Sequence, residues 1–449
     1  MVELMIAAPS SGSGKTMVTA ALLAVLKRRG LAPCAFKCGP DYIDPLFHRA
    51  VLGVESHNLD LFLSDGSTVR ALYARYACGS GAAVCEGVMG FYDGLGGTTD
   101  TAGSWHLADE LGLPVLLVLR PKGASLTLAA EVQGLLAYRP QSHIAGILLN
   151  DCAPSLHATL APMLERETGL PVFGYLPHRA EAAIESRHLG LRTAGEIDGL
   201  AARIGAMADQ MEASVDIPRL LAAFDGCEIE AVLPPLPPVT ARIAVARDEA
   251  FSFLYAETLD ALRLAGAEPV PFSPLHDAAL PENIGGLYLP GGYPELYAEA
   301  LSGNVPMRAA VRTAVSGGLP TVAECGGFLY LCGNLQDETG KGWPMAGALP
   351  GSGIRTERLV RFGYTTLTAR EDSLLFRRGE RCPAHEFHYW DCTANGESLY
   401  AEKPVSGRGW TCGVTGPTLY AGFAHLYFAG SPTLARRFVR MASCYGEKR

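Results

Sequence analysis

A glycine-rich turn near the start of the chain constrains the possible folds more than any other feature. The apolar run Leu4–Ala8 leads into Pro9-Ser-Ser-Gly-Ser-Gly-Lys15-Thr16, and a helical pattern continues from there to Arg29. A strand, a glycine-rich loop and a helix in this order form an anion cradle, because the loop N–H groups and the helix N-terminus face the same point. The sequence therefore predicts a phosphate-binding loop at the edge of an α/β sheet.

Two side chains of this loop have expected roles at a bound nucleotide. Lys15 is expected to reach the outer phosphates of ATP, and Thr16 is expected to ligate Mg²⁺. The loop departs from the GxxxxGK[ST] pattern at Pro9, where the pattern has glycine. The alternative is a plain glycine–serine turn with an incidental lysine, but the flanking strand and helix favour a phosphate site. The predicted ATP-binding residues are Gly12, Ser13, Gly14, Lys15 and Thr16.

Acidic side chains follow two further apolar runs. Glu86 comes directly after Ala82–Cys85, and Asp41 and Asp44 lie in the loop after the expected strand Pro33–Lys37. The carboxyl ends of parallel strands form the ligand edge of such a sheet, and carboxylate and phosphate oxygens are the usual surroundings of Mg²⁺. Each acid alone is equally well explained as a solvated loop charge. Together they favour a Mg²⁺ site formed by Thr16, Asp41 and Glu86.

Short apolar runs alternate with helical patterns, which is typical of a parallel sheet covered on both faces. In the first half, strands are expected at Leu4–Ala8, Ala82–Cys85, Val115–Leu119, Ile144–Leu149 and Val172–Tyr175, and helices at Met17–Arg29, Thr127–Ala137 and Leu156–Thr168. Four prolines between residues 233 and 239 exclude a helix or a central strand there. A second α/β unit follows, with strands expected at Ala241–Ala246, Gly286–Leu289 and Pro320–Ala323. The sequence thus predicts an N-terminal domain over 1–232, a linker over 233–240 and a C-terminal domain over 241–440.

A cysteine in the C-terminal half has a chemical setting. Cys325 stands between the strand expected at Pro320–Ala323 and Gly326-Gly327, which opens a helical pattern. A tight turn of this kind lifts a nucleophile to the sheet edge, and a helix N-terminus is expected to lower the pKa of the thiol. Backbone N–H groups of Gly292 and Gly326 are expected to form an oxyanion hole. His425 is the expected base, an interpretation that depends on Cys325, since a lone histidine is more often structural.

Composition excludes several classes of protein. At 449 residues and 48% hydrophobic content, the chain is expected to fold into two or three domains. A net charge of −9 without a dense Lys/Arg block argues against a nucleic-acid partner. The apolar stretches are shorter than the roughly 20 residues of a membrane span, and the first strand begins too early for a signal peptide. We therefore expect a cytoplasmic protein without a membrane partner. The twelve cysteines form no CxxC pair, which argues against a zinc or iron–sulfur site.

Six strings of the sequence jointly resemble one family of enzymes. They are Ser-Gly-Ser-Gly-Lys-Thr16, Gly39-Pro-Asp-Tyr-Ile-Asp44, Glu86-Gly-Val-Met-Gly-Phe-Tyr-Asp93-Gly, Pro290-Gly-Gly-Tyr-Pro-Glu295, Glu324-Cys-Gly-Gly327 and His385-Glu-Phe-His-Tyr389. On these strings nearly the whole chain resembles the cobyrinic acid a,c-diamide synthases, of the CobB/CobQ type. The resemblance implies a dethiobiotin-synthetase-like P-loop domain joined to a class I glutamine amidotransferase domain.

The same resemblance implies an activity and its partners. The activity is ATP- and Mg²⁺-dependent amidation of the a and c acetate side chains of cobyrinate, through an acyl phosphate, within cobalamin biosynthesis. The partners are the corrinoid, L-glutamine or ammonia, and ATP. Asp41, Glu86 and Asp93 are implied around ATP, metal and the substrate carboxylate, with Asp44 and Asp93 assigned to the acyl-phosphate end. The segment His385-Glu-Phe-His388 is expected to be a loop or strand near the domain interface that contacts the corrinoid. Its surroundings favour a strand, in which the two histidines fall on opposite faces, and this argues against a shared metal.

One position departs from the usual amidotransferase pattern. In most triad-type enzymes a Glu follows two residues after the His, whereas Tyr427 occupies that place here. A backbone carbonyl, a hydroxyl or another acid must then orient His425. Alternative substrates are hydrogenobyrinate and nickel sirohydrochlorin, and a different reading is a regulatory P-loop protein with a degenerate glutaminase fold. The sequence leaves the oligomeric state open, with a homodimer as one alternative.

Overall fold

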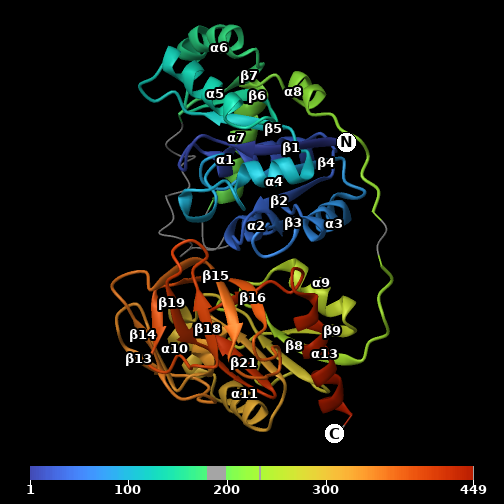
Figure 1. Cartoon of the computed structure of the whole chain (residues 1–449), viewed down its shortest axis with the longest axis vertical. Helices are drawn as coiled ribbons and strands as arrows, with labels where there is room; N and C mark the ends of the chain where they lie inside the picture. The colour runs from blue at the N-terminus through green and yellow to red at the C-terminus, as the bar shows by residue number, and fades with distance from the viewer. Residues whose placement is uncertain (179–198, 232–233, 448–449) are drawn as a thin grey trace. The chain divides into compact units, whose positions relative to one another are not determined.

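The computed structural model of the chain describes residues 1–178, 199–231 and 234–447. The chain divides into two compact units, Met1–Leu233 and Pro234–Arg449 (Figure 1). Residues 234–240 form neither helix nor strand, and all of them are exposed to solvent. An exposed, proline-rich segment therefore opens the second unit.

Unit 1 is built on a seven-stranded parallel sheet in the order β3-β2-β4-β1-β5-β6-β7. The strands are β1 (Val2–Ala7), β2 (Pro33–Cys38), β3 (Ser56–Leu59), β4 (Ala82–Glu86), β5 (Val115–Leu119), β6 (Ile144–Asn150) and β7 (Val172–Leu176). All strands expected from the apolar runs are present, which confirms the parallel α/β fold. Sequence reasoning missed β3, because this edge strand is polar: His48 Nδ1 and Ser56 Oγ lie 3.0 Å apart, and Asn58 donates to Gly39 O at 2.9 Å.

Helices cover both faces of this sheet (Figure 1). Side chains of α3 (Gly66–Ala77), α4 (Ser104–Leu111), α5 (Leu126–Tyr138) and α6 (Pro154–Thr168) share one apolar core with Met5 and Ala7 of β1. Side chains of α1 (Lys15–Arg28), α7 (Leu200–Ser214) and α8 (Ile217–Ala223) share another core with Leu4 and Ile6. Because alternate residues of a strand point to opposite faces, β1 contributes apolar residues to both cores, and it lies at the centre of the sheet. The glycine-rich loop follows directly after the carboxyl end of β1.

Unit 2 contains a six-stranded sheet in the order β20-β21-β11-β10-β8-β9. The strands are β8 (Ala241–Ala246), β9 (Ala267–Phe272), β10 (Gly286–Leu289), β11 (Thr321–Glu324), β20 (Val414–Gly416) and β21 (Leu419–Gly422), and only β20 runs antiparallel to its neighbour. Its helices are α9 (Ala256–Leu264), α10 (Ala298–Gly303), α11 (Val305–Ser316), the six-residue α12 (Gly326–Leu331) and α13 (Pro432–Gly446), with a 3₁₀ turn η5 (Pro294–Tyr297). The predicted second α/β unit is confirmed.

Two smaller sheets complete unit 2. One has the order β13-β12-β14-β17 and the other the order β19-β18-β15-β16-β22. Their strands are β12 (Asn334–Gln336), β13 (Gly342–Pro344), β14 (Ser352–Arg355), β15 (Arg361–Ala369), β16 (Arg381–His388), β17 (Trp390–Cys392), β18 (Leu399–Glu402), β19 (Gly409–Cys412) and β22 (His425–Leu426). Burial alternates along β16, so His385 and His388 lie on opposite faces, as predicted. His385 pairs in register with His425 of β22, which fixes His425 at the edge of this sheet.

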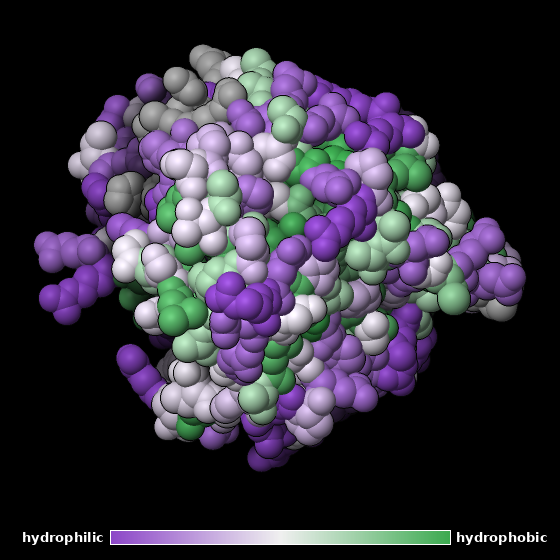
Figure 2. All heavy atoms as spheres, turned by 90° about the horizontal axis from the view of Figure 1, so that it is seen from above, coloured by the Kyte–Doolittle hydropathy of each residue, from purple (hydrophilic) through white to green (hydrophobic). Residues whose placement is uncertain are grey.

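The surface is mixed in character. Figure 2 shows hydrophilic and hydrophobic residues interspersed over one face of the molecule. Within the described ranges, the helices are all too short or too polar to pass through a lipid bilayer. The twelve cysteines are free thiols, and nine of them are buried as small apolar residues, the expected state for most of them.

Candidate functional site

The glycine-rich loop connects β1 to α1, as the sequence predicts. Gly12 and Gly14 have φ angles of 78° and 95°, a region that favours glycine. Asn150, at the end of β6, donates to Ser13 O at 2.9 Å, and a β-carbon on Gly14 would collide with the Asn150 side chain. The loop is therefore held by a residue that lies far away in the sequence and that no local motif reveals.

Lys15 lies under the loop and is mostly buried. Its ammonium group donates to Ser10 O at 3.3 Å and to Met89 O. Burial lowers the pKa of Lys15 to about 8, and Lys37 adds to this effect, whereas Glu86 and Asp93 oppose it. A negative ligand at this point would restore the full charge of Lys15. Asp93 is also tied to the loop that follows β4, since it accepts from the Gly90 N–H at 3.0 Å.

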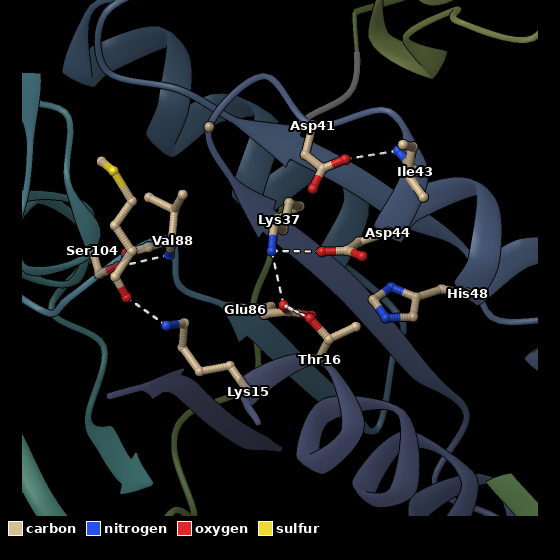
Figure 3. A network of polar contacts seen from close by, with 12 residues as sticks. Lys15, Thr16, Lys37, Asp41, Ile43, Asp44, His48, Glu86, Val88 and Ser104 are labelled. Carbon is tan, nitrogen blue, oxygen red and sulfur yellow. Dashed lines mark hydrogen bonds and ion pairs between the residues drawn. The ribbon is translucent and has the colours of Figure 1, made fainter. Parts of the chain in front are cut away.

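Charged side chains converge at the carboxyl ends of β2 and β4 (Figure 3). Thr16 Oγ1 donates to Glu86 Oε1 at 2.7 Å, and Lys37 Nζ lies 2.8 Å from Glu86 Oε1 and 2.6 Å from Asp44 Oδ2. Burial raises the pKa of Glu86 to about 7, against the opposing charge of Lys37. Burial by itself would lower the pKa of Lys37, but Asp44, Glu86 and Asp41 together raise it well above its ordinary value. The cluster is thus a buried network in which Lys37 lies between the carboxylates of Asp44 and Glu86.

Sequence reasoning missed Lys37 as a member of this site. The available signal was a lysine inside the apolar strand β2, because a buried charge requires a partner. Asp44 (in α2, Ile43–Phe47) is linked to Glu86 through this lysine. Asp41 accepts from the Ile43 N–H at 2.7 Å and raises the pKa of Lys37 at longer range. The structure therefore brings Thr16, Asp44 and Glu86 into one contact network, with Asp41 beside it.

The residues present fit a Mg²⁺ ion that arrives with a nucleotide. Glu86 Oε2 is buried without a hydrogen-bond partner, and the Thr16 hydroxyl lies against the other oxygen of the same carboxylate. Mg²⁺ commonly takes one or two protein oxygens and completes its shell with phosphate oxygens and water. Across the described ranges, no three His, Cys, Asp or Glu side chains are grouped so as to hold a metal by themselves. Thr16 and Glu86 could hold the ion together with phosphate.

Cys325 occupies a strained turn between β11 and α12. Its φ and ψ angles are 47° and −104°, a conformation that is costly for a residue other than glycine. The Cys325 N–H donates to Gly422 O at 2.7 Å, and the Gly326 N–H is directed at the thiol. A strand, a strained turn and a helix in this order match the elbow geometry that the sequence predicts.

The expected lowering of the thiol pKa is wrong. Burial raises the pKa of Cys325 well above its ordinary value, with further contributions from the buried Glu295, Glu386 and Glu324. The Gly326 N–H opposes this rise but does not overcome it. The cause is that α12 is a short helix in an apolar, carboxylate-rich surrounding, where desolvation disfavours the thiolate. Cys325 therefore needs a base to become a nucleophile.

Glycines create the space in which Cys325 and His425 meet. A β-carbon on Gly291 would collide with the His425 imidazole and lie 3.4 Å from the Cys325 β-carbon, so both side chains face the Gly291 backbone. A β-carbon on Gly326 would come within 3.0 Å of the Gly292 nitrogen. The structure thereby brings Cys325, His425, Gly292 and Gly326 to one place, which is what a thiol-dependent amide-cleaving site requires.

The comparisons with known proteins cover both units. Residues 4–191 match the family described as CobQ/CobB/MinD/ParA nucleotide binding domain, and residues 242–433 match the CobB/CobQ-like glutamine amidotransferase domain. A cobyrinate a,c-diamide synthase of Clostridium acetobutylicum is 38% identical, covering 98% of this chain and 100% of the relative. The chain belongs to the a,c-diamide synthase family. It is a glutamine amidotransferase ligase with a nucleotide-binding domain.

Two further members of the a,c-diamide synthase family are similar over their whole length. A cobyrinate a,c-diamide synthase of Caldanaerobacter subterraneus is 36% identical, with 99% of both chains covered. A hydrogenobyrinate a,c-diamide synthase of Thermobifida fusca is 37% identical, with 98% of this chain and 97% of the relative covered. The family thus includes proteins named for two different corrinoid substrates.

An acid approaches His425 from a position that sequence reasoning did not assign. The Nδ1 atom of His425 lies 3.7 Å from Glu324 Oε2. Tyr427, where triad-type amidotransferases usually have Glu, is buried and packs edge-on against Tyr255 with ring centroids 5.1 Å apart. The signal for Glu324 was present in the sequence, because an acidic residue ends an otherwise apolar strand directly before the nucleophile.

Proposed function

We propose that this enzyme amidates the a and c acetate carboxylates of cobyrinate, with ATP as the activating substrate and glutamine or ammonia as the nitrogen donor. The observation that carries the proposal is the meeting of Cys325 and His425 at the Gly291 backbone, on a chain that also has a phosphate loop. Full-length relatives are named for this reaction. We assign the amidoligase half to residues 1–232 and the glutaminase half to 241–440, joined by the linker 233–240.

The amidoligase half makes the carboxylate reactive. A carboxylate oxygen of the substrate attacks the γ-phosphorus of ATP, ADP leaves, and an acyl phosphate forms. Lys15 neutralises charge on the transferred group, and this kind of catalysis is mainly positioning and electrostatics. Thr16 and Glu86, with Asp41 nearby, would hold Mg²⁺, which supplies further charge neutralisation when bound. Ammonia then attacks the acyl carbon and phosphate leaves.

Asp44 and Asp93 are assigned to the acyl-phosphate end of this site. Asp44 is held by Lys37, and Asp93 lies close enough to Lys15 to raise its pKa. Both carboxylates therefore border the lysines that would surround the transferred phosphoryl group. The ion pair with Asp44 holds Lys37 in place before substrates bind.

The glutaminase half releases ammonia from L-glutamine. His425 accepts the thiol proton, and the Cys325 sulfur attacks the amide carbon while the N–H groups of Gly292 and Gly326 receive the oxyanion. The intermediate collapses to a thioester, and the amide nitrogen leaves as ammonia with the proton from His425. Water then attacks the thioester, which yields glutamate and the free thiol. The raised pKa of Cys325 explains why a base is required.

The proposal is tested by separating the two nitrogen sources. Cys325→Ala should lose glutamine-dependent amidation and keep ammonia-dependent amidation. Lys15→Ala should lose both, because the lost contact to the transferred phosphoryl group is worth about 3 kcal/mol or more, over a hundredfold in rate. Product is measured by mass spectrometry. Near-normal ammonia-dependent turnover by Lys15→Ala, or loss of both activities in a folded Cys325→Ala, would contradict the proposal.

Hydrogenobyrinate is the second candidate substrate. The relative from Thermobifida fusca, named for that substrate, is as similar to this chain as the cobyrinate enzymes are. Turnover of purified cobyrinate, hydrogenobyrinate and nickel sirohydrochlorin should be compared at equal enzyme concentration. The substrate with the highest kcat/KM identifies the physiological class, and a preference for nickel sirohydrochlorin would overturn both corrinoid assignments.

A further inference from the structure

The strand register places an acid beside the proposed base. Glu324 is the last residue of β11 and pairs with Gly422 of β21, and His425 follows three residues later. The turn that lifts Cys325 out of the strand is fixed to the same residue, because the Cys325 N–H donates to Gly422 O. Consecutive residues of the chain thus supply the nucleophile and an acid to one site.

The Glu324 carboxylate is held at both of its oxygens. Oε1 accepts from the Leu426 N–H at 3.2 Å, and Oε2 accepts from the Tyr288 hydroxyl at 3.1 Å while it lies 3.7 Å from His425 Nδ1. Glu324 is 1% exposed and His425 is 2% exposed, so water does not screen this pair. A distance of 3.7 Å is longer than a hydrogen bond, but catalytic hydrogen bonds are often long in the absence of substrate and tighten in the complex with it.

The other acids near Cys325 are unsuited to act as the counter-charge. Burial raises the pKa of Glu295 to about 8, so this group is mainly protonated at neutral pH. Glu386 lies 3.4 Å from His388 Nε2 and 4.0 Å from Arg361 Nε, and these two contacts hold its carboxylate. Glu324 is the acid that the structure brings to His425 within the described part of unit 2.

We propose that Glu324 is a positioning residue of the glutaminase site, whose carboxylate orients the His425 ring through Nδ1 and stabilises the imidazolium after the thiol proton is transferred. This inference rests on the glutaminase half of the proposed function. With Nδ1 directed at Glu324, Nε2 is the nitrogen that accepts the proton from Cys325. Glu324, the residue before the nucleophile, thereby has the role that in triad enzymes belongs to the Glu two positions after the histidine.

Among the described residues of unit 2, the titratable groups placed around His425 include Glu324 on β11, Cys325 at the turn and His385 opposite it on β16. Tyr288 on β10 donates to the Glu324 carboxylate. Burial and the neighbouring His425 lower the pKa of His385 to about 3, so His385 stays neutral during turnover. Besides the thiolate that proton transfer leaves on Cys325, Glu324 is the carboxylate of this set that can stabilise the imidazolium.

Two variants separate the charge of Glu324 from its shape. Glu324→Gln keeps the shape and removes the charge, and we expect glutamine-dependent kcat to fall on the order of 10²- to 10⁴-fold with KM for glutamine changed less than about threefold. The acid limb of the kcat/KM pH profile should move to lower pH, because the protonated imidazole loses its counter-charge. Glu324→Asp keeps the charge on a shorter side chain, and its glutamine-dependent kcat should be at least tenfold higher than that of Glu324→Gln. Ammonia-dependent amidation should stay at the wild-type level in both.

A control variant removes a different carboxylate of unit 2. Glu380 is ion-paired with Arg437 and not with His425, so Glu380→Gln should leave the acid limb in place. An equal shift in both variants would overturn the proposal, as would a Glu324→Gln enzyme with wild-type kcat. If Cys325→Ala and His425→Asn themselves keep glutamine-dependent amidation, the proposed glutaminase function fails. If Cys325→Ala and His425→Asn lose glutamine-dependent amidation but Glu324→Gln keeps it at the wild-type rate, only the role of Glu324 is refuted.

Discussion

Replacement of Gly291 by alanine tests whether Cys325 and His425 work as one site. Gly291 does not have a positive φ angle, so its backbone accepts alanine without strain. The added β-carbon would nevertheless overlap the His425 imidazole, whereas two carbon atoms require about 3.5 to 4.0 Å. The imidazole must therefore move by about 1 Å. Because a displacement of about 1 Å costs on the order of 10²-fold in rate, we expect a loss of about 2.7 kcal/mol in transition-state stabilisation.

The assay measures glutamate release and product amidation with glutamine and, separately, with ammonium chloride. Gly291→Ala should lose about 10²-fold in glutamine-dependent kcat and keep its ammonia-dependent rate, since the added methyl group lies only at the thiol site. Gly303→Ala is the matched control, because an alanine there has no neighbour within 4 Å. If Gly291→Ala keeps glutamine-dependent kcat within about threefold of wild type, the geometric argument for a Cys325–His425 pair is refuted.

Three further predictions follow from burial and charge. ATP binding at pH 8 should take up about half a proton, because Lys15 with its pKa near 8 is half neutral before the phosphate raises that pKa. Calorimetry in buffers of different ionisation enthalpy measures the proton uptake, and Lys15→Arg should abolish the uptake. Tyr427→Phe should keep the rate of glutamate release within about threefold of wild type, because the Tyr427 ring packs against Tyr255. His425→Asn should lower this rate on the order of 10³-fold. Equal losses in the two variants would make Tyr427 a catalytic partner. Leu117 is fully buried in β5, so Leu117→Ala should lower the free energy of unfolding by about 2 to 5 kcal/mol. Leu126 is exposed, so Leu126→Ala should lower it by less than about 0.5 kcal/mol. Urea denaturation measures both values.

The sequence by itself determined the features that depend on neighbours along the chain. The apolar runs predicted β1, β4, β5, β6 and β7 of the first sheet and β8, β10 and β11 of the second, because a strand buried on both faces is mostly apolar. The glycines before Lys15 and after Cys325 predicted the two turns, since residues without a β-carbon permit a tight backbone turn. The family resemblance rested on these same short strings and is confirmed by full-length relatives.

Only the tertiary structure decided which side chains meet across the fold. Lys37 pairs with Glu86 because β2 and β4 are parallel neighbours in which these two residues are directly opposite. Glu324 approaches His425 because β11 pairs with β21 in a register that no local pattern encodes. The rise in the Cys325 pKa, which reversed the expectation from the helix terminus, depends on burial and on carboxylates from other parts of the chain. Strand register and burial arise from long-range packing, and they set both the partners and the charge of these groups.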